Sequence, residues 1–384
     1  MKVVHINSVY GIGSTGRIVE SIHSNLLNDG IESTVIVGRN HPKFNIDIPR
    51  NTVIDLYSLP KVIMSAIPSV LFDSHGLHSK KNTMIVINYL KTNKPEIVHL
   101  HNIHGFYINY KLLFEYLNST DIKVIWTLHD CWAFTSSCSH YTYYNNYKWK
   151  DGIVYSDERL GYPYRLINRN QRNAKLKKQL VNKNVTIVTP SIWLEGEVSK
   201  SYLKDNELIV INNGVELNDF YPDSQPQTKK ILLGVASAWT KQKGYKEYIK
   251  LSKLISCEYQ IVLIGVSNKQ IRKLKKYNIN GISKTSSIDE LRTWYSSSFF
   301  LINLTLEDNY PTVNLEAVSC GLRVLGYDSG GNKETIQGYG EVVSQYKINE
   351  IYELIRLNKE YIKEPHFHNT REMYDEYKKL YVRK

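Results

Sequence analysis

The sequence has few cysteines and no long hydrophobic run, and each shortage excludes a class of protein. Its four cysteines show no paired spacing, which excludes a secreted scaffold built on disulfide bonds. Residues 1–6 are too few and too polar for a signal peptide. The most apolar stretch, residues 59–72, is interrupted by Lys61 and Pro68 and is far shorter than the ~20 residues of a membrane-spanning helix. We therefore expect a soluble cytoplasmic protein.

The overall composition is typical of a large folded protein. Of the 384 residues 42% are hydrophobic, and 49 Lys and Arg against 37 Asp and Glu leave a net charge of +12. This balance excludes a disordered acidic chain and a low-complexity protein. At ~150 residues per domain, the length predicts two or three domains. The excess positive charge predicts an anionic partner: nucleic acid, a phosphorylated ligand or lipid head groups.

Short apolar runs rich in β-branched residues recur in two series, with helical patterns between them. The first series comprises residues 3–6, 34–37, 97–100, 124–127 and 186–189, and the second comprises 231–235, 261–264, 299–302 and 324–325. Such runs are typical of parallel sheets covered on both faces. A polar, Pro-punctuated segment at 219–227 separates the series, and we place the linker there. The pattern predicts an α/β protein of two doubly wound domains with a cleft between them, and a last helix at about 370–382 that packs back on the body.

Glycines follow the first strand of the first series. Gly11, Gly13 and Gly16 have the G-x-G-x-x-G spacing that lets the backbone approach a phosphate at a helix start. A dinucleotide site also needs an acid after the second strand, where Arg39 stands and would suit only a 2′-phosphate. Residues 7–10 also make the turn longer than that motif allows. We therefore favour a loop that faces an anion or a sugar, with a loop that binds no ligand as the alternative.

Histidines gather after two strands of the first series. His99, His101 and His104 could suggest a metal site, because alternate residues of a strand share one face. No carboxylate partner or second cluster accompanies them, so we predict no metal and hydrogen-bonded histidines at a strand end. His129 stands beside Asp130 at the carboxyl end of its strand, facing the predicted cleft. A functional role is predicted for it, with a structural histidine as the alternative.

The sharpest feature is the acidic segment 307–316, which follows the strand at 299–302. Pro311 favours a helix start at this point. Asp308 then lies in the loop, and Glu316 lies about one turn inside the helix. The free N–H groups of the helix start lie between the two carboxylates and suit a diphosphate.

Lysines also follow the first strand of the second series. Lys241 and Lys243, with Gly244 next to them, lie in the segment that follows the run 231–235. An ammonium group there could neutralise a phosphate, and solvated surface lysines are the alternative.

At these residues the sequence resembles the retaining glycosyltransferases of family 4, which have the GT-B fold, over nearly the whole chain. Asp308-x7-Glu316 is similar to that family's Glu-x7-Glu motif, and residues 317–324, 330–334 and 239–244 are similar to its "EA-x-x-x-G-x-P-V" tail, "GG-N-x-E" turn and phosphate clamp. Residues 99–105 and 128–134 most resemble bacterial exopolysaccharide enzymes of the colanic-acid type. Three positions depart from the pattern. The first acid is Asp308, with Glu307 as a possible substitute; Gln242 replaces a common clamp Arg, with Lys241 as a possible substitute; and Arg323 stands where a Pro is usual.

The resemblance implies a fold and an activity. The fold is GT-B, with two Rossmann-like domains facing across a cleft: an acceptor-side domain of residues 1–220 with the C-terminal helix 366–384, and a donor-binding domain of 221–365. The activity is transfer of a hexose, with retention, from a nucleotide-diphosphate sugar to a saccharide or lipid-diphosphate-linked acceptor in surface polysaccharide biosynthesis. The resemblance implies neither a metal ion nor another cofactor.

The resemblance also implies a role for each site residue. His129, Asp308 and Lys243 are the implied catalytic residues. The implied donor-binding residues are Gly13, Ser14, Lys241, Lys243, Glu307, Asp308, Asn309, Tyr310, Thr312 and Glu316. Lys243 and the helix start at Thr312 would hold the diphosphate, and Glu316 would accept hydrogen bonds from the ribose. Asp308 and His129 would contact the donor sugar, and the leaving phosphate would take the acceptor's proton.

A basic run between Arg159 and Lys183 has eight Lys and Arg and no acid. It predicts an anionic lipid surface as a further partner and a peripheral position on the inner face of the plasma membrane, with a solvated helix face as the alternative. Residues 59–72 could add an apolar patch to that surface.

Three other functions remain as alternatives. The Gly loop and Arg39 allow an NADP-dependent oxidoreductase, and a GT-B sugar-nucleotide epimerase or phosphorylase would share the fold. The charge of +12 allows a nucleic-acid binder. The 29 tyrosines, however, are spread along the chain without a basic–aromatic module, so we predict no nucleic-acid partner.

Overall fold

The computed structural model describes residues 1–40, 49, 51–135, 138–142, 167, 169–182, 184–223, 230–358 and 368–383. The chain folds into two compact units. The first unit is Met1–Ile211 with Tyr374–Lys384, and the second unit is Asn212–Met373. Residues 159–166, 168 and 183 of the basic run and residues 224–227 of the expected linker lie outside the described residues.

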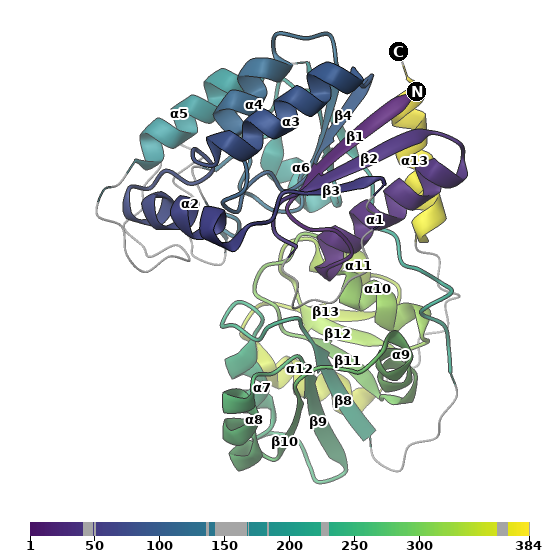
Figure 1. The fold of residues 1–384 in the computed structure, drawn as a ribbon. Coiled ribbons are helices and arrows are strands. Elements are labelled where there is room, and N and C mark those ends of the chain that lie inside the picture. Colours follow the sequence, from purple (N-terminus) through teal and green to yellow (C-terminus); the bar gives the residue numbers. More distant parts are fainter. Residues whose placement is uncertain are drawn as a thin grey trace. The chain divides into compact units, whose positions relative to one another are not determined.

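The first unit is built on a parallel sheet with the strand order β3-β2-β1-β4-β5-β6-β7. Its strands are β1 (Lys2–Asn7), β2 (Glu32–Val37), β3 (Val53–Asp55), β4 (Ile97–Leu100), β5 (Lys123–Thr127), β6 (Val185–Thr189) and β7 (Leu208–Val210). Its helices are α1 (Gly13–Asn28), α2 (Leu59–Leu71), α3 (Lys80–Asn93), α4 (Tyr110–Leu117), α5 (Asn170–Leu180), α6 (Ile192–Val198) and the greater part of α13 (Thr370–Val382). Helices α3, α4 and α5 cover one face of the sheet, and α1 and α13 cover the other (Figure 1).

Alternate residues of the central strands divide between these two faces. Val4, Val98 and Trp126 are buried in one apolar core with residues of α3 and α4. His5 and His99 point to the opposite face, where the Tyr381 hydroxyl of α13 lies 2.7 Å from His99 Nδ1. Helix α13 therefore covers a polar strip of the sheet, and the predicted packing of the last helix on the N-terminal domain is confirmed.

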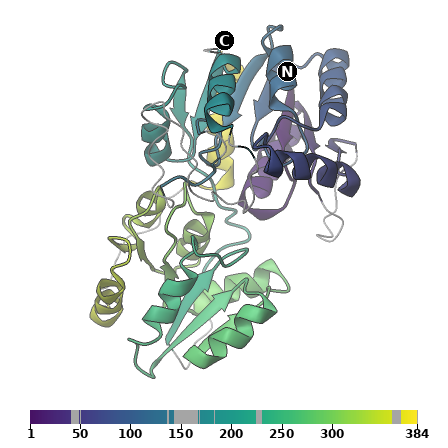
Figure 2. The ribbon, with the colours of Figure 1, turned by 90° about the vertical axis from the view of Figure 1, so that its left-hand side faces the viewer.

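The second unit repeats the architecture with the strand order β10-β9-β8-β11-β12-β13. Its strands are β8 (Lys230–Val235), β9 (Tyr259–Ile264), β10 (Ile279–Ile282), β11 (Phe300–Asn303), β12 (Val324–Tyr327) and β13 (Gly340–Val343). Its helices are α7 (Tyr245–Leu251), α8 (Asn268–Leu274), η3 (Lys275–Tyr277), α9 (Ile288–Ser297), α10 (Thr312–Ser319), α11 (Asn332–Ile336) and α12 (Ile348–Leu357). Figure 2 shows its sheet between two layers of helices.

Both sheets have a strand order that reverses next to the first strand of the unit. The reversal lies between β1 and β4 in the first unit and between β8 and β11 in the second. Loops that leave the carboxyl ends of such strands are where doubly wound sheets bind ligands. The Gly loop follows β1, His129 follows β5, and the Lys and acidic segments follow β8 and β11, so these predicted segments leave the carboxyl edges of the two sheets.

The structure differs from the expectations at a few places. All nine expected strands are present, but the edge strands β3, β7, β10 and β13 were not predicted. The chain enters the second unit after Ile211, earlier than the expected 220/221, because Val215 and Phe220 are buried in the core of that unit. Pro311 caps α10 rather than occupying its first turn. Among the described residues no helix is both long and apolar enough to cross a bilayer.

Candidate active site

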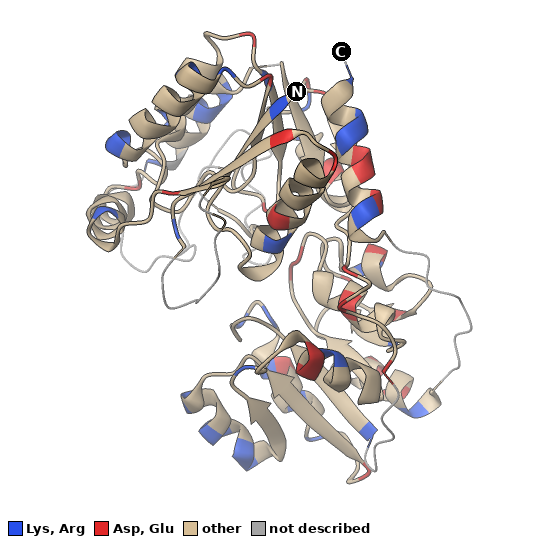
Figure 3. Cartoon of the chain, turned by 45° about the vertical axis from the view of Figure 1, so that its right-hand side comes forward, with Lys and Arg blue, Asp and Glu red and all other residues tan. Residues whose placement is uncertain are grey.

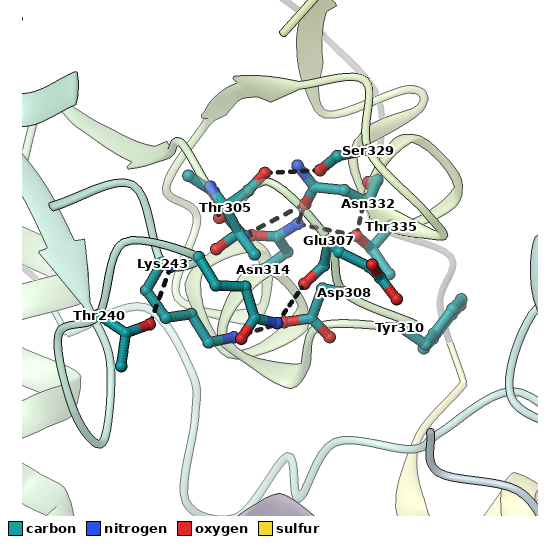
Figure 4. A network of polar contacts seen from close by, with 12 residues as sticks. Thr240, Lys243, Thr305, Glu307, Asp308, Tyr310, Asn314, Ser329, Asn332 and Thr335 are labelled. Carbon is teal, nitrogen blue, oxygen red and sulfur yellow. Dashed lines mark hydrogen bonds and ion pairs between the residues drawn. The ribbon is translucent and has the colours of Figure 1, made fainter. Parts of the chain in front are cut away.

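An ion pair joins the two loops that follow β8 and β11 in the second unit. Lys243 Nζ lies 2.6 Å from Asp308 Oδ2, and the two side chains are 32% and 22% exposed (Figure 4). The neighbouring Glu307 is fully buried, whereas Asp308 is accessible. The sequence allowed either Glu307 or Asp308 as the first acid of the x7 motif that ends at Glu316. Because only Asp308 is accessible, Asp308 is the one that can reach a ligand.

Hydrogen bonds between the two loops hold Lys243 in place. The Leu306 N–H donates to the Gln242 carbonyl at 2.7 Å, and the Gln242 side-chain amide donates to the Glu307 carbonyl at 2.9 Å. Gln242 therefore ties the loops together at the position where the family often has an Arg. Gly244 has a φ of +74°, and a Cβ there would overlap the Leu304 carbonyl oxygen. Only glycine suits this close approach.

The turn that follows β12 fixes the backbone of Asp308. The Gly331 N–H donates to the Asp308 carbonyl at 2.9 Å. Gly330 has a φ of +60°, and a Cβ at Gly330 would overlap the same carbonyl oxygen. Gly330 thus allows the close backbone contact that brings Asp308 to the site, and the Gly331 N–H holds it there.

Three buried asparagines position the start of α10. Asn303 Nδ2 donates to Asn314 Oδ1 at 2.8 Å, and Asn314 Nδ2 donates to Asn332 Oδ1 at 2.7 Å (Figure 4). They come from the end of β11, from α10 and from α11. Sequence reasoning did not assign Asn303 or Asn314 to the site, although Asn314 lies within the Asp308-x7-Glu316 segment and Asn332 within the Gly-Gly-Asn turn. The network fixes where the N–H groups of α10 point.

Helix α10 carries the remaining predicted donor-binding residues of the segment. Thr312 is its first residue, and its first turn has N–H groups without intrahelical acceptors. Glu316 is only 7% exposed, and its Oε2 accepts a hydrogen bond from the Tyr295 hydroxyl at 2.9 Å. Asn309 is buried and Tyr310 half-buried in the loop before the helix, and Lys241 is exposed. The second unit thus brings Lys243 and Asp308 together in the loops that follow β8 and β11, and the loop of Asp308 leads into α10.

The other predicted residues lie at the carboxyl edge of the first unit's sheet. Gly13 and Ser14 are exposed and begin α1, directly after the turn that follows β1. The Gly11 N–H donates to the Gly16 carbonyl at 3.1 Å, so the Gly segment is a compact turn. His129 follows β5, and its Nε2 lies 3.0 Å from His101 Nδ1.

Buried histidines surround His129. His5, which sequence reasoning missed, lies with its Nδ1 at 3.3 Å from His101 Nε2, and the ring nitrogens of His5, His99 and His101 all lie within 4.8 Å of one another. His99 bonds through its ring nitrogens to the Tyr381 and Thr127 hydroxyls at 2.7 and 2.8 Å. His104 Nε2 instead lies 2.8 Å from Asp130 Oδ2.

Burial determines the charge state of these groups. It lowers the pKa of His129 to about 4 and that of His5 to about 3, and it holds the pKa values of His99 and His101 well below the usual value. Burial raises the pKa of Asp130, but the His104 and His140 rings and the hydrogen bonds from His104 and from the Trp132 N–H together hold that pKa below its ordinary range. The histidine strip, which we define as His5, His99, His101 and His129, is therefore uncharged at neutral pH.

This strip predicts an acid-sensitive fold. Histidines of the unfolded chain have a pKa of about 6.5 and bind protons below that pH, whereas the buried histidines of the folded chain stay neutral. The free energy of unfolding is therefore at its full value above pH ~6.5 and falls as the pH drops toward ~4. Each histidine contributes a slope of up to about 1.4 kcal/mol per pH unit. Urea unfolding at pH 7.5, 6.5 and 5.5 should show this decline, and a flat profile over that range would contradict it.

The close approach at Gly244 predicts a specific instability. Gly244→Ala should lower the free energy of unfolding by roughly 2 kcal/mol or more, because the Cβ meets the Leu304 carbonyl and the left-handed backbone is strained. Gly196→Ala is the matched control, because a Cβ at this helical glycine meets nothing within 4 Å. It should be neutral or stabilising by up to about 1 kcal/mol in denaturant unfolding. Equal effects of the two substitutions would disprove the packing argument.

Comparisons with known proteins agree with this arrangement. Residues 15–219 match the model of "Glycosyltransferase Family 4", and residues 218–380 match that of "Glycosyl transferases group 1". The chain is 22% identical to the putative colanic acid biosynthesis glycosyl transferase WcaC of Escherichia coli (strain K12), over 96% of this chain and 93% of that protein.

Solved structures share the fold. The sucrose-phosphate synthase of Thermosynechococcus elongatus superposes with a TM-score of 0.69 at 14% identity, over 99% of this chain and 96% of that one. The Anabaena protein HepE in complex with UDP gives 0.62 at 11% identity, over 99% of each chain. The predicted GT-B fold is thereby confirmed.

Proposed function

The chain belongs to glycosyltransferase family 4, and from this premise we propose that it transfers a hexose from a nucleoside-diphosphate sugar with retention and without a metal ion. The observation that carries the proposal is the juxtaposition of the Lys243 ammonium, the Asp308 carboxylate and the start of α10 at one sheet edge. The acceptor is a saccharide or a lipid-diphosphate-linked sugar. The likeness to a colanic acid biosynthesis protein supports a role in surface polysaccharide biosynthesis.

The ion pair prepares both charges for the donor. When the diphosphate binds, Lys243 exchanges Asp308 for a phosphate oxygen, and Asp308 exchanges Lys243 for a hydroxyl of the donor sugar. Each group has a partner before and after the exchange, so neither charge is left desolvated and unpaired. The N–H groups of α10 from Thr312 onward add further donors and the positive end of the helix dipole.

Glu316 is placed to recognise the nucleoside. Its carboxylate is mostly buried, and the Tyr295 hydroxyl fixes the position of Oε2. A carboxylate in this setting accepts hydrogen bonds from two adjacent ribose hydroxyls. Recognition of the ribose and of the diphosphate thus comes from two places on the same short helix.

The chemistry needs stabilisation of the leaving group. The bond between the anomeric carbon and the diphosphate breaks, the acceptor oxygen bonds to that carbon on the same face, and the acceptor's proton passes to the leaving phosphate oxygen. Lys243 and the oriented N–H groups stabilise the growing negative charge at the diphosphate. His129, Gly13 and Ser14 are the first unit's contribution toward the sugar and the acceptor. Because the leaving phosphate takes the proton, no protein base is required.

Removing one charge at a time tests the site. Lys243→Ala and Glu316→Ala should each lower kcat/KM about 100-fold or more without unfolding the protein, as for loss of one donor to a developing charge. Activity would be measured with UDP-, GDP- and ADP-sugars, after a thermal-shift panel has identified the donor. Lys253→Ala, which removes an exposed ammonium elsewhere in the second unit, should leave the rate unchanged. Wild-type turnover in either site variant would contradict the assignment.

The same assay tests whether the transferred sugar keeps its anomeric configuration and whether the reaction needs a metal ion. Proton NMR of the first product formed should show the anomeric configuration of the donor, and excess EDTA should leave the rate unchanged. An inverted product or loss of activity in EDTA would disprove the corresponding part of the proposal.

A surface of the first unit supports a position at an anionic membrane. Helix α2 carries its apolar side chains outward: Leu59, Ile63, Met64 and Ile67 are 48–74% exposed, whereas Ser65 and Ser69 are buried. This spacing is a helical stripe. Only Lys61 is charged on α2, and Figure 3 shows the basic residues on the neighbouring helices. An outward apolar stripe of this kind suits the interface of a bilayer.

A basic groove lies next to α2. A cavity of about 540 Å³ between α3, α4 and α5 is lined by Lys80, Lys111, Arg172 and Lys175. Asp73, just after α2, accepts a hydrogen bond from the Arg169 N–H at 2.9 Å, which keeps the start of α5 beside α2. The groove offers lipid phosphates several cations close to the apolar stripe.

The expected basic run contributes only partly to this surface. Lys177 is buried, with its ammonium 3.3 Å from the centroid of the Trp132 ring, and is no part of an exposed face. Arg159, Arg165 and Lys183 lie outside the described residues.

Liposome sedimentation tests this surface. The protein should bind vesicles that contain phosphatidylglycerol more than neutral ones, and Met64→Glu with Ile67→Glu should abolish binding. Ile288→Glu, at an exposed apolar residue of the second unit, is the control and should not alter it. Equal binding to both vesicle types, or binding to neither, would contradict the proposal. A dimer in which the apolar stripe of α2 packs against a second copy of the chain would contradict it as well.

A further inference from the structure

A chain of hydrogen bonds joins the buried His5 and His101 of the first unit to the half-buried His129. His129 Nε2 lies 3.0 Å from His101 Nδ1, and His101 Nε2 lies 3.3 Å from His5 Nδ1. At the other end, His5 Nε2 is buried and has no hydrogen-bond partner among the described residues. The chain therefore begins inside the unit at His5 and reaches the carboxyl edge of the sheet at His129.

The register of the strands produces this chain. His5 of β1 pairs with His99 of β4, and His101 lies two residues beyond His99 on the same face. His129 lies two residues beyond Thr127, the last residue of β5. The rings of His101 and His129 are stacked, with their centroids 5.3 Å apart and their planes 16° from parallel.

All three imidazoles are uncharged at neutral pH. Burial lowers the pKa of His5 to about 3 and that of His129 to about 4, and burial with neighbouring His99 holds the pKa of His101 well below its usual value. A neutral imidazole has one N–H and one lone pair. Every ring in the chain must therefore donate in the same direction.

The unpartnered end decides that direction. If the N–H groups pointed toward His5, the chain would end in a buried N–H without an acceptor. If they point toward His129, it ends in an unused lone pair, which is the more common state of a buried polar group. In this second arrangement His101 donates to Nε2 of His129, and the proton of His129 must lie on Nδ1.

We propose that His5 and His101 are positioning residues that hold His129 in its Nδ1–H form, so that His129 meets the donor sugar as an uncharged hydrogen-bond donor. The inference rests on the part of His129 in the proposed function. It gives the first unit a role in donor binding that needs no titration near neutral pH.

A metal ion is the competing explanation of the cluster. The ring nitrogens of His5, His99 and His101 are close enough together to share one. Both nitrogens of His99, however, already bond to hydroxyl groups, and both nitrogens of His101 bond within the chain. A metal ion would have to replace these hydrogen bonds, so the geometry favours the histidine chain.

Long-range ¹H–¹⁵N correlation spectra of histidine-labelled protein report the tautomers directly. Wild-type His129 should be in the Nδ1–H form. His5→Leu removes the donor to His101, so His129 should become a mixture of tautomers and kcat should fall about tenfold, the size of one lost hydrogen bond. His5→Gln supplies an amide N–H at that end and should restore both. If His5→Leu does not fold, the wild-type tautomer decides the matter.

A matched control separates the change of the His129 tautomer from a general disturbance of the packing around these histidines. His99→Gln alters the same face but not the chain, so the tautomer of His129 should persist. The proposal is overturned by an Nε2–H form of wild-type His129, by equal effects of His99→Gln and His5→Leu, or by a stoichiometric metal ion in elemental analysis. The NMR spectra are recorded without a nucleotide-sugar donor. If the proposed function is wrong, the predicted loss of kcat fails but the predicted tautomer of His129 is still tested.

Discussion

The ion pair between Lys243 and Asp308 is the interaction on which the site depends. Its two residues lie 65 positions apart in the sequence, and both remain partly exposed. A pair of this kind contributes only about 0–1 kcal/mol to stability, so its importance is positional. The left-handed Gly244 and Gly330, the Gln242 tie and the asparagine network all serve to bring these two charges to the start of α10. The second unit thus presents a preorganised set of charges and N–H donors at the carboxyl edge of its sheet.

The two units carry chemically different groups at their sheet edges. The second unit has a cation, a carboxylate and a helix dipole, which suit an anion and its ribose. The first unit has neutral imidazoles whose hydrogen bonds run along the sheet under α13. The two sheet edges thus offer different chemistry: charged groups in the second unit and uncharged imidazoles in the first.

Much of this arrangement could be predicted from the sequence, for identifiable reasons. Central strands are buried on both faces and give continuous apolar runs, whereas the edge strands β3 and β7 have three residues each and are partly exposed, so their pattern is weak. Lys243 and Asp308 could be found because they lie in the loops that follow two recognisable strands, β8 and β11. His5 and Asn303 could not, because their partners are set by strand register rather than by spacing along the chain. The buried Lys177 was misplaced because a run of charge does not reveal a cation packed on an aromatic ring.

A crystal structure with the donor nucleotide bound tests the central claim most directly. The account predicts that the diphosphate lies against the first turn of α10, with Lys243 released from Asp308 and bonded to a phosphate oxygen. A nucleotide anchored instead on the glycines of residues 11–16, with the Lys243–Asp308 pair intact, would contradict it.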